Sequence, residues 1–312
     1  MNKKKVNIII LNYNGKNLLA KYIPSVIEAS QKSKHDCKVS VIDNKSSDES
    51  VKFIKDNFKN VQLYEAKLNK VLCSFNEYLK IIEDEIVIFL NNDIKVDPYF
   101  VDPLIKYFDD KDVLFVSPKE LSMEDGRYLG NLNMAFFRFG LLTARVKYKN
   151  HNHRQYNLAA HGGAYDRKKF LYLDGYDTIY LPGIIEDLDL CYRGWKHGWK
   201  GIYEPESFFY HEGSTSFNEV YGIKKKSLFA HRNSFIFFWK NITSPKLIFF
   251  HLVFLPVFLL EALIRRRYTA IKGFFQALKM LPFVLERRVN VIPQFQINDE
   301  TVINKIKGDL SE

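Results

Sequence analysis

Short apolar runs alternate with segments of helical periodicity through the first hundred residues. The runs predict buried strands at 6–11, 39–42, 61–64 and 86–90. Between the runs, apolar residues recur every three or four positions, which predicts helices at 17–30, 51–58 and 75–82. Strands that alternate with helices form βαβ units, so we expect an α/β fold whose mostly parallel sheet is flanked by helices.

The pattern becomes less regular after the fourth predicted strand. Residues 113–160 follow neither period clearly, so we expect mainly loops there, with His151 and His153 in a solvated loop. A helix is predicted to begin near Glu186. Its buried face would carry Leu188, Tyr192 and Trp195, and Asp189 has the spacing of an intrahelical ion pair with Arg193.

The carboxyl-terminal part is apolar and basic together. Residues 247–264 contain only His251 and Glu261 as strongly polar side chains, although Pro256 interrupts them, and 273–285 has the character of an interfacial helix. We expect a helical extension at 221–312 that associates peripherally with a membrane surface. The alternative is a helical pair packed on the rest of the chain or in a homodimer interface.

The amino-acid composition excludes disordered and fibrous proteins, and the distribution of charge argues against a nucleic-acid-binding protein. At 312 residues, with 46% hydrophobic and 15% aromatic residues, the chain is neither disordered nor fibrous. Its net charge of +10 comes from residues 223–290, where thirteen Lys or Arg face two acids. These cations are interleaved with aliphatic runs, which argues against a nucleic-acid partner.

Cysteine use and the amino terminus both favour a cytoplasmic protein. Three widely spaced cysteines, without metal-ligand spacing, are expected to be reduced thiols. The first apolar run has six residues, which is too short for an export signal. With the basic extension, this predicts a location at the inner face of the cell membrane.

Asn and Asp residues follow three of the predicted strands. The clusters are Asn12-Tyr13-Asn14, Asp43-Asn44 and Asn91-Asn92-Asp93. Ligands of open parallel sheets bind beyond the carboxyl ends of the strands, so the three clusters together favour one nucleotide crevice. Each cluster alone is equally consistent with helix capping.

A second group of candidates lies between residues 161 and 216. Gly162 and Gly163 allow close backbone approach to a ligand, or form a turn. Glu186 and Asp187 open the predicted helix, where acids are favoured by the helix dipole whatever their role. Unlike Asp189, Asp187 has no partner in the local sequence.

Over residues 6–216 the chain resembles the family 2 glycosyltransferases, inverting enzymes with the GT-A fold. The motifs that carry the resemblance are IIILNYNG, VIDNKSSDES, FLNNDIKVDP, the Gly162-Gly163 pair, GYD at 175–177, EDLDLCYR and HEGSTS. Rhamnosyltransferases are the subgroup that it resembles most. The resemblance implies a GT-A catalytic domain at 1–220, with a nucleotide-binding half at 1–112 and a catalytic half, including acceptor-side loops, at 113–220.

The resemblance also implies roles for individual residues. A UDP- or dTDP-sugar donor would contact Asn12, Tyr13, Asn14, Asp43, Asn44, Asn69, Asn76 and Asn92. Asp43 would accept a hydrogen bond from N3–H of the pyrimidine. Asp93 and His211 would bind Mg²⁺ or Mn²⁺. Asp187 would be the general base, with Glu186 as the other catalytic candidate and with Gly162, Gly163 and Glu186 near the sugar and acceptor.

At two positions the sequence departs from the family pattern, and these departures affect the predicted donor and the predicted catalytic activity. Val71 stands where related sequences often have glycine, which puts the shape of the nucleotide loop and the donor's identity in doubt. Only Asp93 is acidic in its motif, which supports an alternative, a non-catalytic nucleotide-sugar-binding partner of a glycan-assembly complex. For an enzyme, the expected acceptor is a saccharide that is lipid-linked or at the cell surface.

Overall fold

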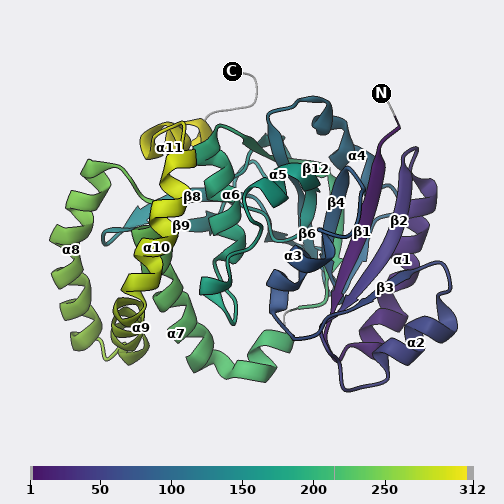
Figure 1. Cartoon of the computed structure of the whole chain (residues 1–312), viewed down its shortest axis with the longest axis horizontal. Coiled ribbons are helices and arrows are strands. Elements are labelled where there is room, and N and C mark those ends of the chain that lie inside the picture. Colours follow the sequence, from purple (N-terminus) through teal and green to yellow (C-terminus); the bar gives the residue numbers. More distant parts are fainter. Residues whose placement is uncertain (1–2, 214, 308–312) are drawn as a thin grey trace.

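The computed structural model describes residues 3–213 and 215–307 as one α/β body with a helical end (Figure 1). The strands are β1 (Lys5–Asn12), β2 (Asp36–Asp43), β3 (Gln62–Glu65), β4 (Ile86–Asn91), β5 (Ile94–Val96), β6 (Val113–Ser122), β7 (Tyr128–Gly130), β8 (Asn133–Arg138), β9 (Leu141–Val146), β10 (Gln155–Tyr156), β11 (Gly163–Asp166) and β12 (Lys200–His211). The α-helices are α1 (Lys16–Lys32), α2 (Ser50–Asn57), α3 (Phe75–Tyr78), α4 (Val101–Ile105), α5 (Arg167–Tyr172), α6 (Glu186–His197), α7 (Thr215–Asn241), α8 (Pro245–Ile264), α9 (Tyr268–Lys279), α10 (Leu281–Val291) and α11 (Asp299–Lys307). Short 3₁₀ turns lie at Val71–Ser74, Lys106–Asp109, Thr178–Tyr180 and Ile292–Gln294.

The main sheet is mixed and mostly parallel. Its order is β10-β12-β6-β11-β4-β1-β2-β3, with β5 paired to β12 and β7 to β6. The four strands predicted first, β1 to β4, are mutually parallel, and β11 runs antiparallel between β4 and β6. The carboxyl ends of β1, β2 and β4 therefore meet at one edge of the sheet.

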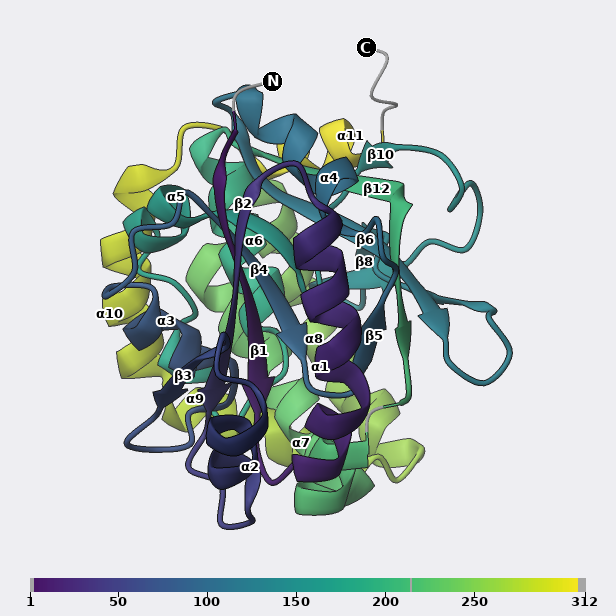
Figure 2. The ribbon, with the colours of Figure 1, turned by 90° about the vertical axis from the view of Figure 1, so that its right-hand side faces the viewer.

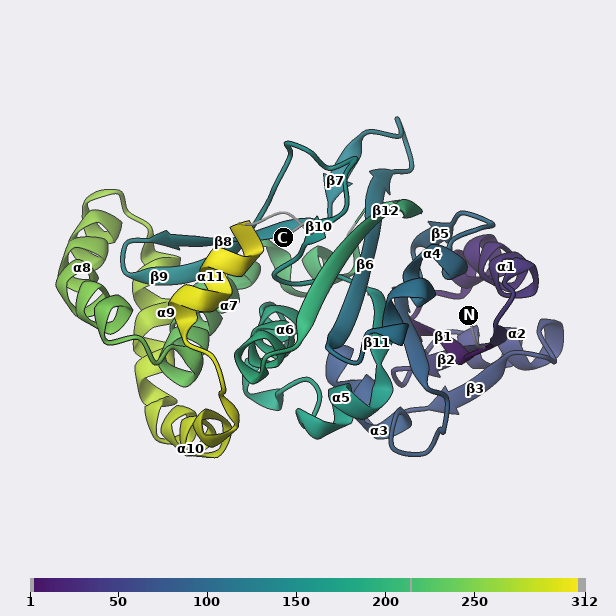
Figure 3. The same ribbon diagram turned by 90° about the horizontal axis from the view of Figure 1, so that it is seen from above.

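Alternation along the strands separates two hydrophobic layers. Ile8 and Ile10 face one layer with helices α1 and α4, whereas Ile9 and Leu11 face the other with α3, α5 and α6. Figures 2 and 3 show these helices on opposite faces of the sheet. The four predicted strands are present as β1 to β4. Strands β1, β2 and β4 are largely buried, as expected of strands covered on both faces, whereas β3 is an edge strand with exposed and half-buried residues.

The prediction of loops over 113–160 was wrong. This stretch contains β6, β7, the β8–β9 hairpin and β10. The strands were missed because β6 and β12 change register at a bulge, and most side chains of the hairpin are only partly buried, so neither shows clean alternation.

The carboxyl-terminal helices share a hydrophobic core with the α/β body. Phe235–Phe238 of α7, with residues of α8 to α11, belong to the same buried cluster as Phe89 and Trp195. The interfacial helix predicted at 273–285 is divided between α9 and α10, because Pro282 begins a new helix after Met280. Helix α8, by contrast, continues through Pro256.

Candidate active site

The polar clusters after β1, β2 and β4 form one hydrogen-bonded group. The buried amide of Asn12 donates to Asp43 Oδ2 at 2.9 Å, and Asn92 donates to Asn12 Oδ1 at 2.8 Å. A Cβ on Gly15 would lie 2.0 Å from Asn92 Nδ2, so only glycine allows α1 to begin against this group. Asp43 also accepts from the backbone and hydroxyl of Ser46. The polar edge of the sheet is thus assembled by side chains at the carboxyl ends of three strands.

Neighbouring candidates shape the loops around this group. Asn14 Oδ1 accepts from Ser47 N at 2.7 Å and joins the loops after β1 and β2, whereas Tyr13 is 39% exposed and free to meet a ligand. Asn44 donates to Val71 O at 3.1 Å. Val71 has φ of 51°, a left-handed conformation that is unfavourable for a β-branched residue. The backbone at Val71 therefore keeps the conformation that a glycine would adopt.

Asn69 and Asn76 do not join the Asn12–Asp43 group. Asn69 is exposed and accepts a local bond from Val71 N at 3.0 Å. The side-chain amide of Asn76 forms two hydrogen bonds with the backbone of Tyr176. Asn76 Nδ2 donates to Tyr176 O at 2.7 Å, and Asn76 Oδ1 accepts from Tyr176 N at 2.9 Å. The structure therefore gives Asn76 a positioning role at the Gly175–Tyr176 turn, and direct contact between either residue and a nucleotide stays a prediction.

Asp93 and His211 lie side by side at the same edge. His211 Nε2 is 3.0 Å from Asp93 Oδ2, and its Nδ1 is 2.7 Å from Glu120 Oε1 on β6. Burial alone lowers the pKa of His211, but its hydrogen bonds with Asp93 and Glu120 outweigh this and raise it to about 10. A protonated imidazole thus offsets two carboxylates that otherwise repel each other, and a metal ion bound by Nε2 would have to displace its proton. Of the HEGSTS segment, Ser214 lies outside the described residues.

The donor set at this position fits a divalent metal ion. Asp93 Oδ1 is buried and has no hydrogen-bond partner within the described part of the chain. Glu120 contacts the other ring nitrogen of His211 and orients the ring, as carboxylates commonly do at metal-binding histidines. Residues 3–213 and 215–307 contain no group of three His, Cys, Asp or Glu side chains placed to hold a metal. A diphosphate would therefore have to supply further oxygen ligands.

Glu186 and Asp187 are the first two residues of α6. Asp187 Oδ2 lies 2.5 Å from His161 Nδ1, and its Oδ1 accepts from Leu188 N at 2.7 Å. His161 leads into β11, which pairs with the end of β4, so this contact places Asp187 at the same edge as Asp43 and Asp93. The His161 side chain is 62% exposed, whereas Asp187 is buried.

The two adjacent carboxyls have opposite pKa shifts. Burial, and then repulsion by Asp187, raise the pKa of Glu186 to about 8. Burial also disfavours an ionised Asp187, but the charge and hydrogen bond of His161 hold its pKa below the ordinary value. At neutral pH, Asp187 is therefore ionised and Glu186 protonated, a division typical of acid–base sites. Glu186 Oε2 is buried and has no partner among the described residues.

The segment leading into α6 is strained and clamped. Ile184 and Ile185 have φ of 75° and 83°, positive values that cost β-branched residues about 1–3 kcal/mol each. From α7, the buried Asn233 Nδ2 contacts the carbonyls of residues 180, 183 and 184 at 2.8–2.9 Å. Arg232 donates to Leu181 O at 2.6 Å. Helix α7 thus fixes the backbone that presents Glu186 and Asp187.

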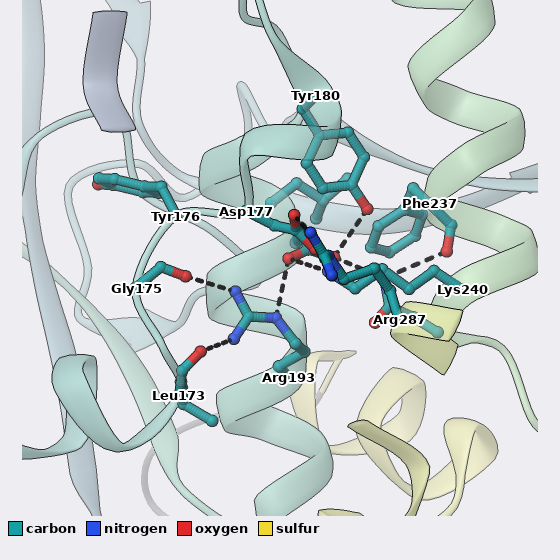
Figure 4. Close-up of polar contacts among 12 residues, drawn as sticks. Leu173, Gly175, Tyr176, Asp177, Tyr180, Arg193, Phe237, Lys240 and Arg287 are labelled. Carbon is teal, nitrogen blue, oxygen red and sulfur yellow. Dashed lines mark hydrogen bonds and ion pairs between the residues drawn. The ribbon is translucent and has the colours of Figure 1, made fainter. Parts of the chain in front are cut away.

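A buried charge cluster locks α6 to α7 one turn further on (Figure 4). The predicted Asp189–Arg193 ion pair is present at 2.8 Å, and Leu188, Tyr192 and Trp195 are buried as expected. Lys240 of α7 bonds to Asp189 at 3.0 Å and to Asp177 at 2.6 Å. Although burial disfavours an ionised Asp189, Lys240 and Arg193 lower its pKa below the ordinary value. The cluster holds α6 against α7, and its ion pairs do not involve Asp187.

Gly162 and Gly163 are required by strand packing. Both have positive φ, and a Cβ would lie 2.8 Å from Phe89 O at Gly162 and 2.6 Å from Val116 O at Gly163. Glycine at these positions lets β11 insert between β4 and β6 and brings His161 to Asp187. A direct contact of either glycine with sugar or acceptor stays a prediction.

Three residues of the site were missed from the sequence: Glu120, His161 and Asn233. Glu120 lies in the stretch that was predicted to be loops, and Asn233 lies in a helix assigned to the extension. His161 immediately precedes the glycine pair that was singled out, and this adjacency was the one available signal.

The comparisons with known proteins agree with this fold. The family model for glycosyl transferase family 2 matches residues 7–170, more than half of the chain. No curated protein matches the sequence significantly. GalNAc-T7, solved with UDP, GalNAc and Mn²⁺, superposes on this chain with a TM-score of 0.55 and 18% sequence identity. The match covers 81% of this chain and 55% of the GalNAc-T7 chain, so this chain spans little more than half of that structure.

A second solved structure matches over more of its length. It is a mannosyltransferase from Pyrobaculum calidifontis in complex with GDP-Man and Mn²⁺, with a TM-score of 0.55 at 13% identity over 94% of this chain and 86% of its own. At these identities the likeness shows a shared GT-A fold. With the family match, the chain belongs to glycosyl transferase family 2.

Proposed function

We propose that the protein is a metal-dependent, inverting glycosyltransferase that moves a hexosyl residue from a UDP- or dTDP-sugar to a saccharide acceptor. The observation that carries the proposal is the meeting of two acidic groups at one crevice edge. One group is Asp93 with His211 and Glu120, and the other is the ionised Asp187 beside a protonated Glu186. The first suits a diphosphate with its cation, and the second suits an acceptor hydroxyl.

Asp187 is the proposed general base. Its carboxylate takes the proton of the acceptor hydroxyl while the hydroxyl oxygen bonds to the anomeric carbon from the face opposite the diphosphate. The bond between that carbon and the diphosphate oxygen breaks at the same time, and its electron pair leaves with the nucleotide. His161 and the Leu188 backbone each hold one oxygen of Asp187, so the base is oriented before the acceptor binds.

The nucleotide diphosphate is proposed to leave beside Asp93 and His211. A bound Mg²⁺ or Mn²⁺ would supply charge stabilisation to the departing diphosphate. Asp93 would direct its unpartnered Oδ1 to the cation, and Glu120 would keep His211 in place. The proposal draws further support from the nucleotide and Mn²⁺ named for the two superposed structures.

The donor is proposed to carry uracil or thymine. Asp43 accepts hydrogen bonds in the group after β2, and N3–H of these bases is a donor that cytosine lacks. Rhamnose is the favoured sugar on the resemblance of the sequence. A lipid-linked or cell-surface saccharide is the proposed acceptor, with the enzyme peripheral at the cytoplasmic face of a membrane, because the apolar carboxyl-terminal helices adjoin the catalytic half.

A thermal-shift screen of UDP- and dTDP-sugars, with and without Mn²⁺, would identify the donor, because a ligand that binds the folded state raises its stability. Hydrolysis or transfer of that donor is expected to require metal and to fall about 10²–10⁴-fold in Asp187→Asn, with donor affinity preserved. Asp36→Asn, at the opposite edge of the sheet, is the matched control and should keep full activity. Full turnover in Asp187→Asn would reassign the base.

The absence of three clustered metal-ligating side chains among the described residues favours one alternative. This is a non-catalytic nucleotide-sugar-binding partner of a glycan-assembly complex. Calorimetric binding of the donor without metal-dependent turnover under any condition of the screen would support it.

A further inference from the structure

Helix α8 presents an apolar stripe along its whole outer side. Exposed residues recur at helical spacing, and the most exposed are Phe249, Leu252, Val257, Leu260, Leu263 and Ile264. Within the described residues, no polar side chain is exposed on α8 between Lys246 and Arg265. Figures 1 and 3 both place α8 at the end of the molecule farthest from β3. A stripe of this length on a surface helix calls for a partner.

The polar side chains of α8 face the protein. His251 accepts from Trp239 Nε1 at 2.9 Å and lies 2.9 Å from Gly140 O, and Glu261 pairs with Arg265 and Arg267. Leu247, Phe258 and Ala262 are buried on the same inner side. The inner contacts therefore extend from the first turn of α8 to the last.

Cations border the stripe at both ends. Lys246 precedes it and Arg266 follows it, and Lys272 and Lys279 are exposed on the adjoining α9. None of these four side chains forms an ion pair with another described residue. Arg265 also projects outward, with 71% of its side chain exposed despite its contact with Glu261. Apolar side chains between unpaired cations match a bilayer surface that bears anionic headgroups.

We propose that α8 lies in the plane of an anionic membrane surface, with its outer stripe among the acyl chains and its flanking cations at the headgroups. The inference is independent of the catalytic assignments. With 20 residues and a mean hydropathy of 2.5 over its most apolar 18-residue stretch, α8 is also long and apolar enough to span a bilayer. A span, however, would remove Leu247, His251 and Phe258 from the protein and expose His251 to lipid.

A second copy of the chain is a poorer occupant of the stripe. Lys246 lies at one end of α8, and Arg265 and Arg266 lie at the other. Whether two α8 helices packed parallel or antiparallel, cations would meet cations at both ends. Anionic lipid neutralises these charges, so the charge pattern favours a membrane over a homodimer.

Vesicle flotation of the full chain tests the proposal. Truncation near Ser244 is unsuitable, because it removes Asp299, which pairs with the buried Lys196 at 2.9 Å and accepts from Tyr192. We instead use Leu252→Glu combined with Leu260→Glu, and Ile81→Glu as a control at an exposed apolar residue elsewhere. The wild type and the control should bind phosphatidylglycerol-containing vesicles, at least tenfold more tightly than pure phosphatidylcholine, and the double variant should lose at least tenfold.

Three results would overturn the proposal. Equal binding by the double variant and the wild type would show that the stripe does not contact lipid. Resistance of the bound wild type to extraction at alkaline pH would indicate a span. A wild-type dimer in detergent-free solution that becomes monomeric in the double variant, without any vesicle binding by the wild type, would assign the stripe to a second copy.

Discussion

Replacing Asn233 with leucine tests how far the candidate base depends on helix α7. Asn233 is fully buried, and the two N–H groups of its amide serve three carbonyl oxygens before α6. Leucine has a similar size and donates nothing. Unpaired buried carbonyls cost about 1–3 kcal/mol each, so losing two hydrogen bonds costs about 2–6 kcal/mol if the segment stays in place.

The segment is not expected to stay in place, because it is already strained. Ile184 and Ile185 together store about 2–6 kcal/mol in their positive φ values, a penalty similar to the loss of the clamp. If the segment at Ile184 and Ile185 relaxes in the variant, most of the free energy of unfolding would be retained, but Asp187 would be displaced. Since a shift of about 1 Å can cost 10²-fold in rate, we expect kcat to fall about 10²-fold while donor affinity is preserved.

Steady-state kinetics and calorimetric unfolding of matched variants would measure both effects. Asn7→Leu is the control, because Asn7 is equally buried but bonds to Asp84 and Ser40 at the opposite edge of the sheet. It should lose stability and keep kcat at temperatures where it is folded. Unchanged kcat in folded Asn233→Leu would refute the idea that the clamp positions the base.

Three further variants address the charges around the crevice. His161→Ala removes the group that holds the pKa of Asp187 down, so the acidic limb of the pH dependence of kcat/KM should move to higher pH; an unmoved limb would separate His161 from the base. Glu120→Gln should weaken Mn²⁺ binding about 10–100-fold by titration calorimetry, and wild-type affinity would argue against its role behind the metal site. Lys240→Met leaves Asp189 without one of its buried cations and should cost about 3–5 kcal/mol of unfolding free energy, whereas a loss below about 1 kcal/mol would contradict its role in the cluster.

The first half of the fold was predictable because local pattern and tertiary role coincide there. Strand β1 shows the apolar run and terminal asparagine of a buried parallel strand, and its carboxyl end meets those of β2 and β4. The meeting of Asn12, Asp43 and Asn92 follows from strand direction alone. Residues 113–160 lack such a signal, because bulged and half-covered strands have no regular period.

The site was predictable only where function and local sequence overlap. Asp187 stood out because nothing nearby explained it, and the structure supplies the distant partner, His161. Asn76 has the residue type of a ligand contact, but both of its polar ends are used by the backbone of Tyr176. The partners of Asp187 and Asn76 lie 26 and 100 residues away along the chain, so both contacts depend on the assembled fold, which no local pattern contains.

The most direct test of glycosyl transfer by single displacement is the configuration of the first sugar released. Proton NMR during metal-dependent turnover of the identified donor would show which anomer forms before mutarotation. The account predicts the anomer opposite to that of the donor, and loss of its signal in Asp187→Asn. Release with the donor's own configuration, or at the same rate without Asp187, would contradict it.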